Sequence, residues 1–279
     1  MHCDFTGTDK SVKGPFNCVP SGTQAAAYFA LRAITGENIP TNGGCFRTVT
    51  LKLPEGSLLN PQAPAPVNSR TATIKRVSGC ILGALRAAAP DKIGADGACS
   101  QHVLVLAGND EKGAPYVVGE MIASGSGAGV SCDGVDVIET DTTNCMNLPA
   151  EALEMDAPIR LNRFSLRPDS GGLGTYRGGL GVIREYEVLS GEVQLTHRGE
   201  RHMTAARGAA KGCNGEKAIS KVLRVDGSEE IILSKQMMTL GPGDRLIVET
   251  AGGGGYGLPS GRPEELRKSD FENGKTTQN

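Results

Sequence analysis

The stretch "DSGGLGTYRGGLG", from Asp169 to Gly181, decides how this sequence is interpreted, because six of its thirteen residues are glycine and it runs directly into "VIREYEV". Flexible linkers consist mainly of glycine and serine, whereas this stretch also holds Asp169, Tyr176 and Arg177. Three interpretations are open at this point: a phosphate-binding loop, a set of turns, or the signature of a particular family.

Three further glycine-rich stretches bear on that choice: "GSGAGVSCDG" (125–134), "LGPGDR" (240–245) and "GGGGYG" (252–257). None contains the GK[ST] of a P-loop, so ATP binding by that route has no support. "GGGGYG" formally matches GxGxxG, but the "LPSGRP" that follows cannot begin the helix that a dinucleotide site requires. For most of these glycines we therefore predict close backbone crossings and turns with positive φ.

Composition narrows the class of protein. The 29 Lys and Arg nearly balance the 31 Asp and Glu, so nothing indicates a nucleic acid or an anionic membrane as partner. No apolar run has the length of a membrane span, and the N-terminus lacks the pattern of a secretory signal. The eight cysteines include no CxxC pair, which disfavours a zinc finger and is typical of reduced thiols. We therefore predict a cytoplasmic protein.

The order of predicted elements indicates an α+β fold that is rich in β-strands, with two N-terminal helices and glycine-rich loops. The helices are expected within 21–40, capped by Ser21 or Thr23 and ended by Gly36, and at 70–90, where apolar residues recur at helical spacing. An alternating strand is expected between them, and short strands follow. We predict one domain over 1–262 and a polar, disordered tail over 263–279.

The histidines and carboxylates were weighed as candidate sites. His197 and His202 are five residues apart, His2 is terminal and His102 stands alone before a predicted strand, so we predict no metal site from them. Glu151, Glu154 and Asp156 could share a helical turn and raise one pKa, although solvation or pairing with arginine is the more common outcome. No GxSxG elbow is present, so a serine hydrolase has no support.

The motifs taken in order say more than any one of them. "DFTGT" (4–8), Asn17, "LPEGSLLNPQAPAPV" (53–67), "GSGAGVSCDG", "NLPAEALE" (147–154), the opening stretch and "GGGGYGLP" resemble, in this order, the hydantoinase B/oxoprolinase family. That family includes the B-type subunit of N-methylhydantoinase and the C-terminal part of 5-oxoprolinase. The resemblance extends to about Arg262, and it matches only the C-terminal half of a B-type subunit.

The resemblance implies ATP-dependent hydrolytic opening of a cyclic amide such as a hydantoin or 5-oxoproline. The ATP is handled by an A-type subunit or domain, so a hetero-oligomer and a small cyclic substrate are expected. Family members carry a His/Asp-rich segment for a divalent metal upstream of "DFTGT", so we assign no metal ligand here. We expect the isolated chain to be inactive. The alternatives are a subunit of a related ATP-dependent ketone carboxylase and a non-catalytic remnant or scaffold.

The resemblance also implies site residues. The catalytic candidates are Asp4, Glu151 and Arg177, of which Arg177 suits a phosphorylated intermediate because guanidinium binds phosphate bidentately. The substrate-binding candidates are Thr6, Gly7, Asn17, Asp133, Gly134, Asp169, Ser170 and Gly178. For each residue, a structural role is an equally good interpretation, for example Asp169 capping a turn or Arg177 pairing with Glu185 or Glu187.

Overall fold

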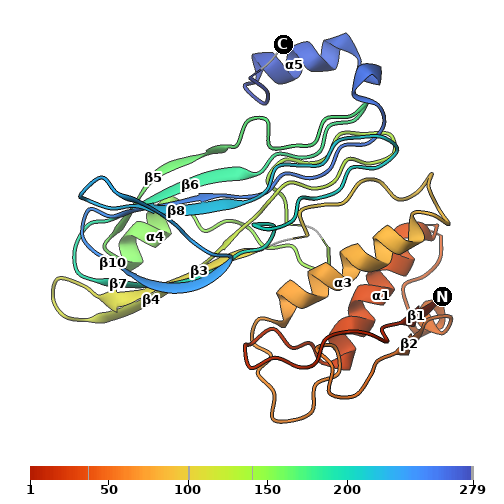
Figure 1. Cartoon of the computed structure of the whole chain (residues 1–279), viewed down its shortest axis with the longest axis horizontal. Helices are drawn as coiled ribbons and strands as arrows, with labels where there is room; N and C mark the ends of the chain where they lie inside the picture. Colours follow the sequence, from red (N-terminus) through yellow and green to blue (C-terminus); the bar gives the residue numbers. More distant parts are fainter. Residues whose placement is uncertain (37, 100, 140, 278–279) are drawn as a thin grey trace. The chain divides into compact units, whose positions relative to one another are not determined.

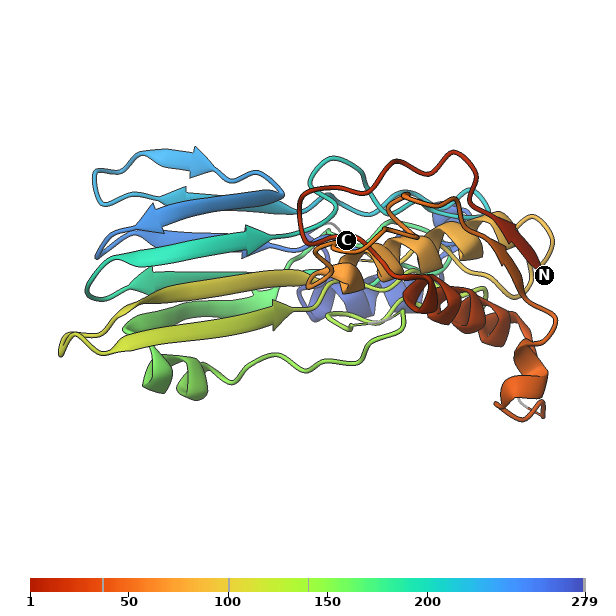
Figure 2. The ribbon, with the colours of Figure 1, turned by 90° about the horizontal axis from the view of Figure 1, so that it is seen from below.

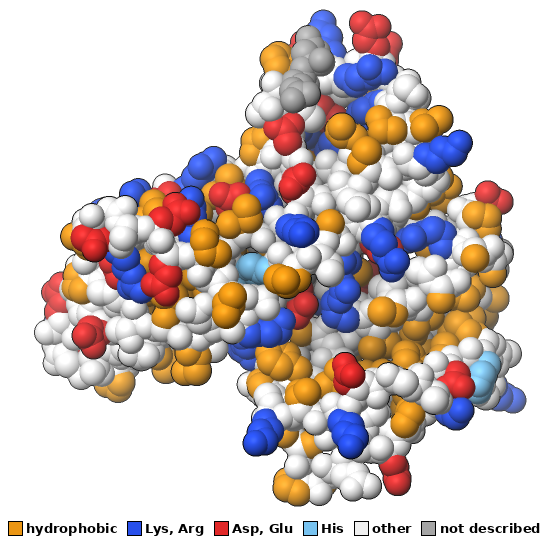
Figure 3. All heavy atoms as spheres, viewed as in Figure 1, with side chains coloured by type: hydrophobic (Ala, Val, Ile, Leu, Met, Phe, Trp, Pro, Cys, Tyr) orange, Lys and Arg blue, Asp and Glu red, His pale blue; other side chains and the backbone are white. Residues whose placement is uncertain are grey.

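The computed structural model describes residues 1–36, 38–99, 101–139 and 141–277, which form two compact units. Unit 1 comprises residues 1–94 and 140–143, and unit 2 comprises 95–139 and 144–279. Among the described residues, no helix is long and apolar enough to cross a membrane. Basic and acidic side chains are interspersed on the face shown in Figure 3.

Unit 1 is built around two packed helices. Its elements are β1 (His2–Asp4), α1 (Pro20–Ile34), α2 (Gly43–Phe46), β2 (Thr50–Lys52) and α3 (Arg70–Leu85). Alanines of α1 pack against the apolar side of α3, and β1 pairs with β2 in parallel (Figure 1). The two predicted helices are therefore confirmed, and the strand expected between them is limited to β2.

The start of α1 differs from the prediction. Its N-cap is Val19, which makes no side-chain cap, and Pro20 occupies the first turn, so neither Ser21 nor Thr23 caps the helix. Proline fits this position because its missing N–H would have no partner there and its φ is already helical. The helix ends at Ile34, just before Gly36, which the sequence predicts as its end.

Unit 2 contains two antiparallel sheets. The first has the order β10-β7-β3-β4, with β3 (His102–Asn109), β4 (Pro115–Ile122), β7 (Val193–Arg198) and β10 (Lys235–Leu240). The second has the order β5-β6-β11-β8-β9, with β5 (Ile159–Leu166), β6 (Val182–Val188), β8 (Ile219–Leu223), β9 (Glu229–Ile231) and β11 (Arg245–Glu249). Figure 2 shows their strands aligned along roughly one axis, with arrows pointing both ways.

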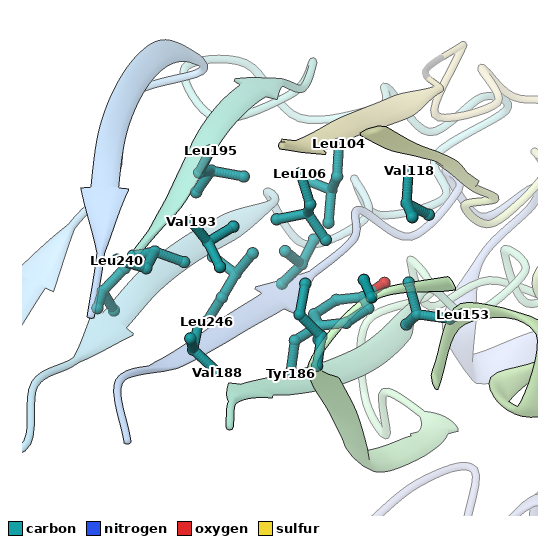
Figure 4. Close-up of a cluster of buried hydrophobic side chains, with 14 of the residues drawn as sticks. Leu104, Leu106, Val118, Leu153, Tyr186, Val188, Val193, Leu195, Leu240 and Leu246 are labelled. Carbon is teal, nitrogen blue, oxygen red and sulfur yellow. The ribbon is translucent and has the colours of Figure 1, made fainter. Parts of the chain in front are cut away.

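The main core lies between these two sheets. Alternate residues of each strand face inward, as in Leu104 and Leu106 of β3, which meet Leu246 of β11 (Figure 4). Helix α4 (Ala150–Asp156) covers one side through Leu153. A buried ion pair of Glu120 and Arg184 lies in the same interior, 2.5 Å apart. The α+β fold class is thus confirmed, with a β-sandwich as its larger part.

Beyond the strands of unit 2, four glycine-rich segments run side by side; we call 125–134, 170–181, 206–215 and 251–256 the glycine stack (Figure 1). Their main chains are hydrogen-bonded to each other, and an ideal Cβ on Gly253 would lie 1.8 Å from the carbonyl oxygen of Ser126. No side chain fits in that space. The opening stretch is therefore rich in glycine because backbones pack directly on backbones.

The end of the chain is ordered helix where the sequence predicts disorder. A short 3-10 helix, η1 (Pro259–Gly261), is followed by α5 (Glu264–Glu272). Pro263 precedes the first turn, which holds Glu264 and Glu265, as is favourable at a helix N-terminus. Its large apolar residues, Leu266 and Phe271, are exposed, and charged side chains attach the segment to the glycine stack, as described below.

Candidate active site

A network of arginines and aspartates joins α5 to the glycine stack. Arg262 donates two hydrogen bonds to Asp133, at 2.7 and 2.8 Å, and a third to Asp270 at 2.6 Å. Arg177, only 3% exposed, forms ion pairs with Asp136 at 3.0 Å and Asp270 at 3.4 Å. We call these five residues the arginine–aspartate network. It replaces the pairing of Arg177 with Glu185 or Glu187 that the sequence suggested.

The network holds its carboxylates in the charged form. Burial by itself raises the pKa of Asp133, but hydrogen bonds from Arg262 and from the Arg177 N–H outweigh it and lower the pKa below the usual value. The pKa of Asp136 is lowered in the same way, since burial is outweighed by Lys275, Leu180 N–H and Arg177. These two aspartates are therefore fixed anions and do not suit proton transfer near neutral pH.

A cavity of about 650 Å³ lies beside the network. Three of its lining side chains are the guanidinium groups of Arg177, Arg262 and Arg267, and three are carboxylates. The lining also includes the backbone of the glycine stack and the polar groups of Asn214 and Thr276. A cavity of this size fits a small ring, and guanidinium groups at its wall suit an oxyanion or phosphate group.

The predicted site residues in and next to the glycine stack lie around this cavity or behind it. Asp169, with φ of 59°, lines the cavity and accepts hydrogen bonds from Thr277. Ser170 is buried, donates to Arg167 O at 2.6 Å and accepts from Gly181 N at 2.9 Å. Gly134 donates its N–H to Arg177 O at 2.7 Å, and Gly178 lies against Gly253. Ser170, Gly134 and Gly178 thus act here as parts of the backbone packing.

Four predicted site residues lie in unit 1. Asp4 is exposed at the end of β1, accepts from Thr6 N at 2.8 Å and pairs with Lys52 at 3.1 Å. Hydrogen bonds from Thr6 lower the pKa of Asp4 to about 2, and Lys52 lowers it further. Gly7 has a φ of 94°, and a residue with a Cβ would be strained in this conformation. These contacts describe a tight turn that a carboxylate stabilises.

Asn17 is fully buried in unit 1 and holds two loops together. Its side chain accepts from Val12 N and donates to the carbonyl oxygens of Val12, Gly14 and Pro66, at 2.8 to 3.2 Å. Both the amide oxygen and the amide nitrogen of Asn17 therefore have hydrogen-bond partners within the protein, as buried polar groups normally do. Asn17 therefore holds the loops of unit 1 together, through hydrogen bonds to Val12, Gly14 and Pro66.

Glu151 stands apart from the other candidates in unit 2. It is exposed in the first turn of α4, which packs on β4 and β5. Its neighbour Glu154 accepts a hydrogen bond from Leu161 N at 2.9 Å, whereas Glu151 has no ion pair among the described residues. The three carboxylates of this turn thus lie at the surface, the outcome that is common for such a cluster.

Sequence reasoning missed Arg262, Asp270 and Asp136, which complete the network. Asp270 lies in the segment that the sequence predicts to be a disordered tail. The acidic residues that follow Pro263 are the signal that could have identified a helix there. Arg262 and Asp133 are far apart in the chain, and no local spacing links them.

The argument from spacing separates the histidines, whereas the structure brings three of them together. His102, His197 and His202 come together in unit 2, with ligand-type atoms all within 4.8 Å of one another. Burial lowers the pKa of His102 well below its usual value and that of His197 to about 4, so both rings are neutral near pH 7. The reason for the difference is that β3 pairs with β7, a long-range contact that spacing along the chain does not show.

The sequence is similar to a family of proteins and to several of its members. The sequence matches the model of the hydantoinase B/oxoprolinase family over residues 1–259. 5-Oxoprolinase 1 of Arabidopsis thaliana is 33% identical over 257 residues, which are 91% of this chain and 19% of that protein. Caprolactamase subunit beta of Pseudomonas jessenii is 32% identical, over 92% of this chain and 46% of that subunit.

Two solved structures are similar to the whole chain. The crystal structure of the ATP-dependent caprolactamase from Pseudomonas jessenii superposes with a TM-score of 0.85 and 28% identity, over 97% of this chain and 49% of that chain. A nucleotide-free acetone carboxylase superposes with a TM-score of 0.73 and 18% identity, over 99% and 42%, and this match shows the fold alone. This chain spans half or less of the length of each of these proteins.

Proposed function

The chain belongs to the hydantoinase B/oxoprolinase family, and on that premise we propose that it serves as a B-type component of an ATP-dependent enzyme that opens a cyclic amide by hydrolysis. The observation that carries this proposal is the superposition on the ATP-dependent caprolactamase, since it covers 97% of the chain with a TM-score of 0.85. The proposed substrates are lactams or hydantoins, with 5-oxoproline as a representative.

The proposed chemistry begins from the low reactivity of an amide. Amide resonance must be broken before water can attack, and phosphorylation of the carbonyl oxygen by ATP removes that resonance. We propose that ATP is bound by an A-type partner, as the resemblance implies. The N–H groups of Gly253, Gly254 and Gly255 support this, because all three donate to backbone carbonyls and none is left to bind a phosphate.

The cavity beside the arginine–aspartate network is the proposed site for the activated ring. Arg177, Arg262 and Arg267 line it, and fixed donors placed where charge develops stabilise an oxyanion or a phosphorylated intermediate. Asp133 and Asp136 hold Arg177 and Arg262 in place. No residue of this chain is assigned to the divalent metal that the resemblance implies, and the proposed steps do not use it.

Asp4 and Glu151 remain proposed catalytic carboxylates. With a pKa of about 2, Asp4 suits an orienting role more than the transfer of a proton. Glu151 is tested by comparing Glu151→Gln with Glu154→Gln in the assembled enzyme. A catalytic Glu151 loses about 100-fold or more in kcat, and an unchanged kcat excludes it.

A hetero-oligomer in the cytoplasm completes the proposal. An A-type partner is needed because the ATP-handling step is assigned to it. The reducing location is supported by the eight cysteines of the described chain, which are all free.

The experiment that tests this function uses the chain alone and the complex captured with it from its source cells. Each is given ATP with 5-oxoproline, hydantoin or caprolactam, and ring opening and ADP are measured together. We expect ATP-coupled ring opening by the complex and none by the chain alone. Ring opening by the isolated chain contradicts the need for a partner.

Two other outcomes replace the proposal by its alternatives. Bicarbonate-dependent carboxylation of acetone or acetophenone by the complex, with no ring opening, identifies a ketone carboxylase. A complex that forms but turns over neither ATP nor any of these substrates identifies a non-catalytic scaffold.

A further inference from the structure

Three histidines of unit 2 meet through the pairing of β3 with β7. Leu104 faces His197 in the antiparallel register, so His102, two residues before Leu104, lies on the same inward face as His197. His202 follows β7, and the chain reverses at Arg201, whose φ is 64°. The ring centroids are separated by 6.0 Å between His102 and His197, and by 5.4 Å in each of the other two pairs.

The turn that delivers His202 is firmly held. The guanidinium of Arg201 donates to the carbonyl oxygens of Ala98, Gly97 and Ala205, at 2.7 to 3.0 Å. At Gly199, a Cβ would lie 2.6 Å from the rings of both His102 and His202. Glycine at this position therefore leaves room for the two imidazoles to approach each other.

The ring nitrogens lack partners that buried nitrogens normally have. His102 is fully buried, and neither of its nitrogens has a hydrogen bond within the described residues; the same holds for Nδ1 of His202. A buried polar atom without a partner costs about 1–3 kcal/mol. The unpartnered nitrogens of His102 and His202 therefore indicate that a ligand belongs at this cluster.

His197 carries the support that a metal ligand normally has. Its Nδ1 lies 3.1 Å from Leu233 O, so Nδ1–H donates to that carbonyl and Nε2 keeps its lone pair. A ligating histidine almost always donates its other ring N–H in this way, which fixes the tautomer and the ring orientation. Nε2 lies 2.9 Å from the Ser220 hydroxyl, which is also 3.2 Å from Nε2 of His202.

Lys235, which acts on all three rings, and the carboxylate of Glu200, which acts on His202, are the charged groups near the cluster. Lys235 is the one cation that acts on all three rings, and its ammonium is bound to Glu200 at 2.5 Å and to Gly199 O at 3.1 Å. Among the described residues, no arginine acts on the three rings, so the cluster does not favour an anion as its ligand. Neutral imidazoles are donors to a metal, and nitrogen ligands suit Zn²⁺ and its neighbours in the transition series.

We propose that His102, His197 and His202 form a site for a divalent transition metal, with Zn²⁺ as the preferred ion and a fourth position open to water or the Ser220 hydroxyl. Tetrahedral Zn²⁺ with bonds of about 2.0–2.1 Å places its nitrogens roughly 3.3 Å apart. The rings therefore close in slightly on binding, and the half-buried His202 is the one free to do so. The site joins β3, β7 and the 199–202 turn. This proposal does not depend on the proposed amidase function.

The test measures Zn²⁺ binding by the full chain after removal of metals with EDTA. Titration calorimetry and metal analysis are expected to give one tightly bound Zn²⁺ per chain, and Co²⁺ is expected to give a visible spectrum of nitrogen coordination. His202→Gln, at a half-buried position, and His102→Gln are expected to weaken binding by about 100-fold or more. His2→Gln is the matched control, because His2 is exposed in unit 1, and it is expected to bind as the wild type does.

Competing sites are separated by alkylating the cysteines. If alkylation abolishes Zn²⁺ binding while His202→Gln leaves it unchanged, the ion is held by thiolates and the proposal is overturned. It is also overturned if crystals soaked in Zn²⁺ show water and no anomalous signal between the three rings. His202→Gln must keep the wild-type circular dichroism, and Gly199→Ala offers a second variant, since its methyl group would occupy the space between the rings.

Discussion

Asp133 and Arg262, 129 residues apart in the chain, meet in a two-bonded pair with N–O distances of 2.7 and 2.8 Å. One partner comes from the glycine stack and the other from the residue that leads into α5. The pair therefore fixes the C-terminal segment beside the cavity, and it explains why a polar segment with little apolar surface is ordered.

Arg262→Lys tests the geometry of this pair. Lysine keeps the charge but loses the planar fork that binds both oxygens of Asp133 and reaches Asp270. We expect the free energy of unfolding of unit 2 to fall by about 2 kcal/mol, measured by urea denaturation. Arg163→Lys, on an exposed position of β5, is the control and should change stability by less than about 0.5 kcal/mol. Equal effects of the two variants would contradict the structural role of Arg262.

Acid should weaken the same region. The pKa values of Asp133 and Asp136 are lowered in the folded state, so the unfolded chain binds more protons once the pH approaches about 3.9, the ordinary value for aspartate. Their contribution is complete above that value and is lost as the pH falls through it towards the folded-state pKa values. Urea denaturation between about pH 7 and pH 3 should show this loss. Asp133→Asn should show a smaller loss, and a profile identical to that of the wild type would refute the assignment.

Gly253→Ala tests the packing of the glycine stack. The new Cβ would lie 1.8 Å from Ser126 O, and the atom it meets is main chain, which cannot rotate away. We expect a loss of more than about 3 kcal/mol, or failure to fold. Gly119→Ala, in β4 of the same unit with no atom within 4 Å of the added Cβ, should be neutral or slightly stabilising. A soluble Gly253→Ala protein with wild-type stability would show that the stack is looser than described.

The buried pair of Glu120 and Arg184 allows a double-mutant cycle. Each is almost completely buried, and the Tyr186 hydroxyl donates to the same carboxylate. Glu120→Gln or Arg184→Met alone leaves one buried charge without its partner, so each should cost about 3–5 kcal/mol. The double variant should cost clearly less than the sum. Additive losses would mean that the two charges do not stabilise each other.

Arg177→Lys tests the proposed cavity in the captured complex. Lysine cannot bind an oxyanion or phosphate bidentately. We expect kcat for ATP-coupled ring opening to fall by about 100-fold, with a smaller change in KM. Thermal unfolding of the same sample separates this from a loss of structure, because Arg177 also pairs with Asp136. Unchanged kcat in a folded variant would remove Arg177 from the proposed site.

Local pattern was sufficient for part of the fold. The alanines of α1 and the apolar spacing of α3 predict helices that form, and alternation predicts strands such as β3 and β11. Helix α5 was missed because its stability comes from Arg262 and Asp270, which no hydrophobic pattern reveals. The histidine cluster was missed for a related reason, since the register of Leu104 with His197 joins positions that are remote in sequence.

The candidate site shows the same division. The close backbone crossings predicted for the glycines of the opening stretch are present, but the positive φ also predicted is found at none of these glycines. Their partners could not be predicted, since Gly252, Gly253 and Gly254 each meet a different segment of the stack. The roles of Asp4, Glu151 and Arg177 in catalysis stay predictions until activity is measured.

The glycine stack also limits where substrate preference can change. Its segments meet mainly through main-chain atoms, so most of its positions cannot take another side chain to fit a larger or smaller ring. Leu173 and Asn214 lie between the glycines and do line the cavity. Changes that alter the size or polarity of the ring that the cavity accepts should therefore begin at these two positions, with the glycines around them left unchanged.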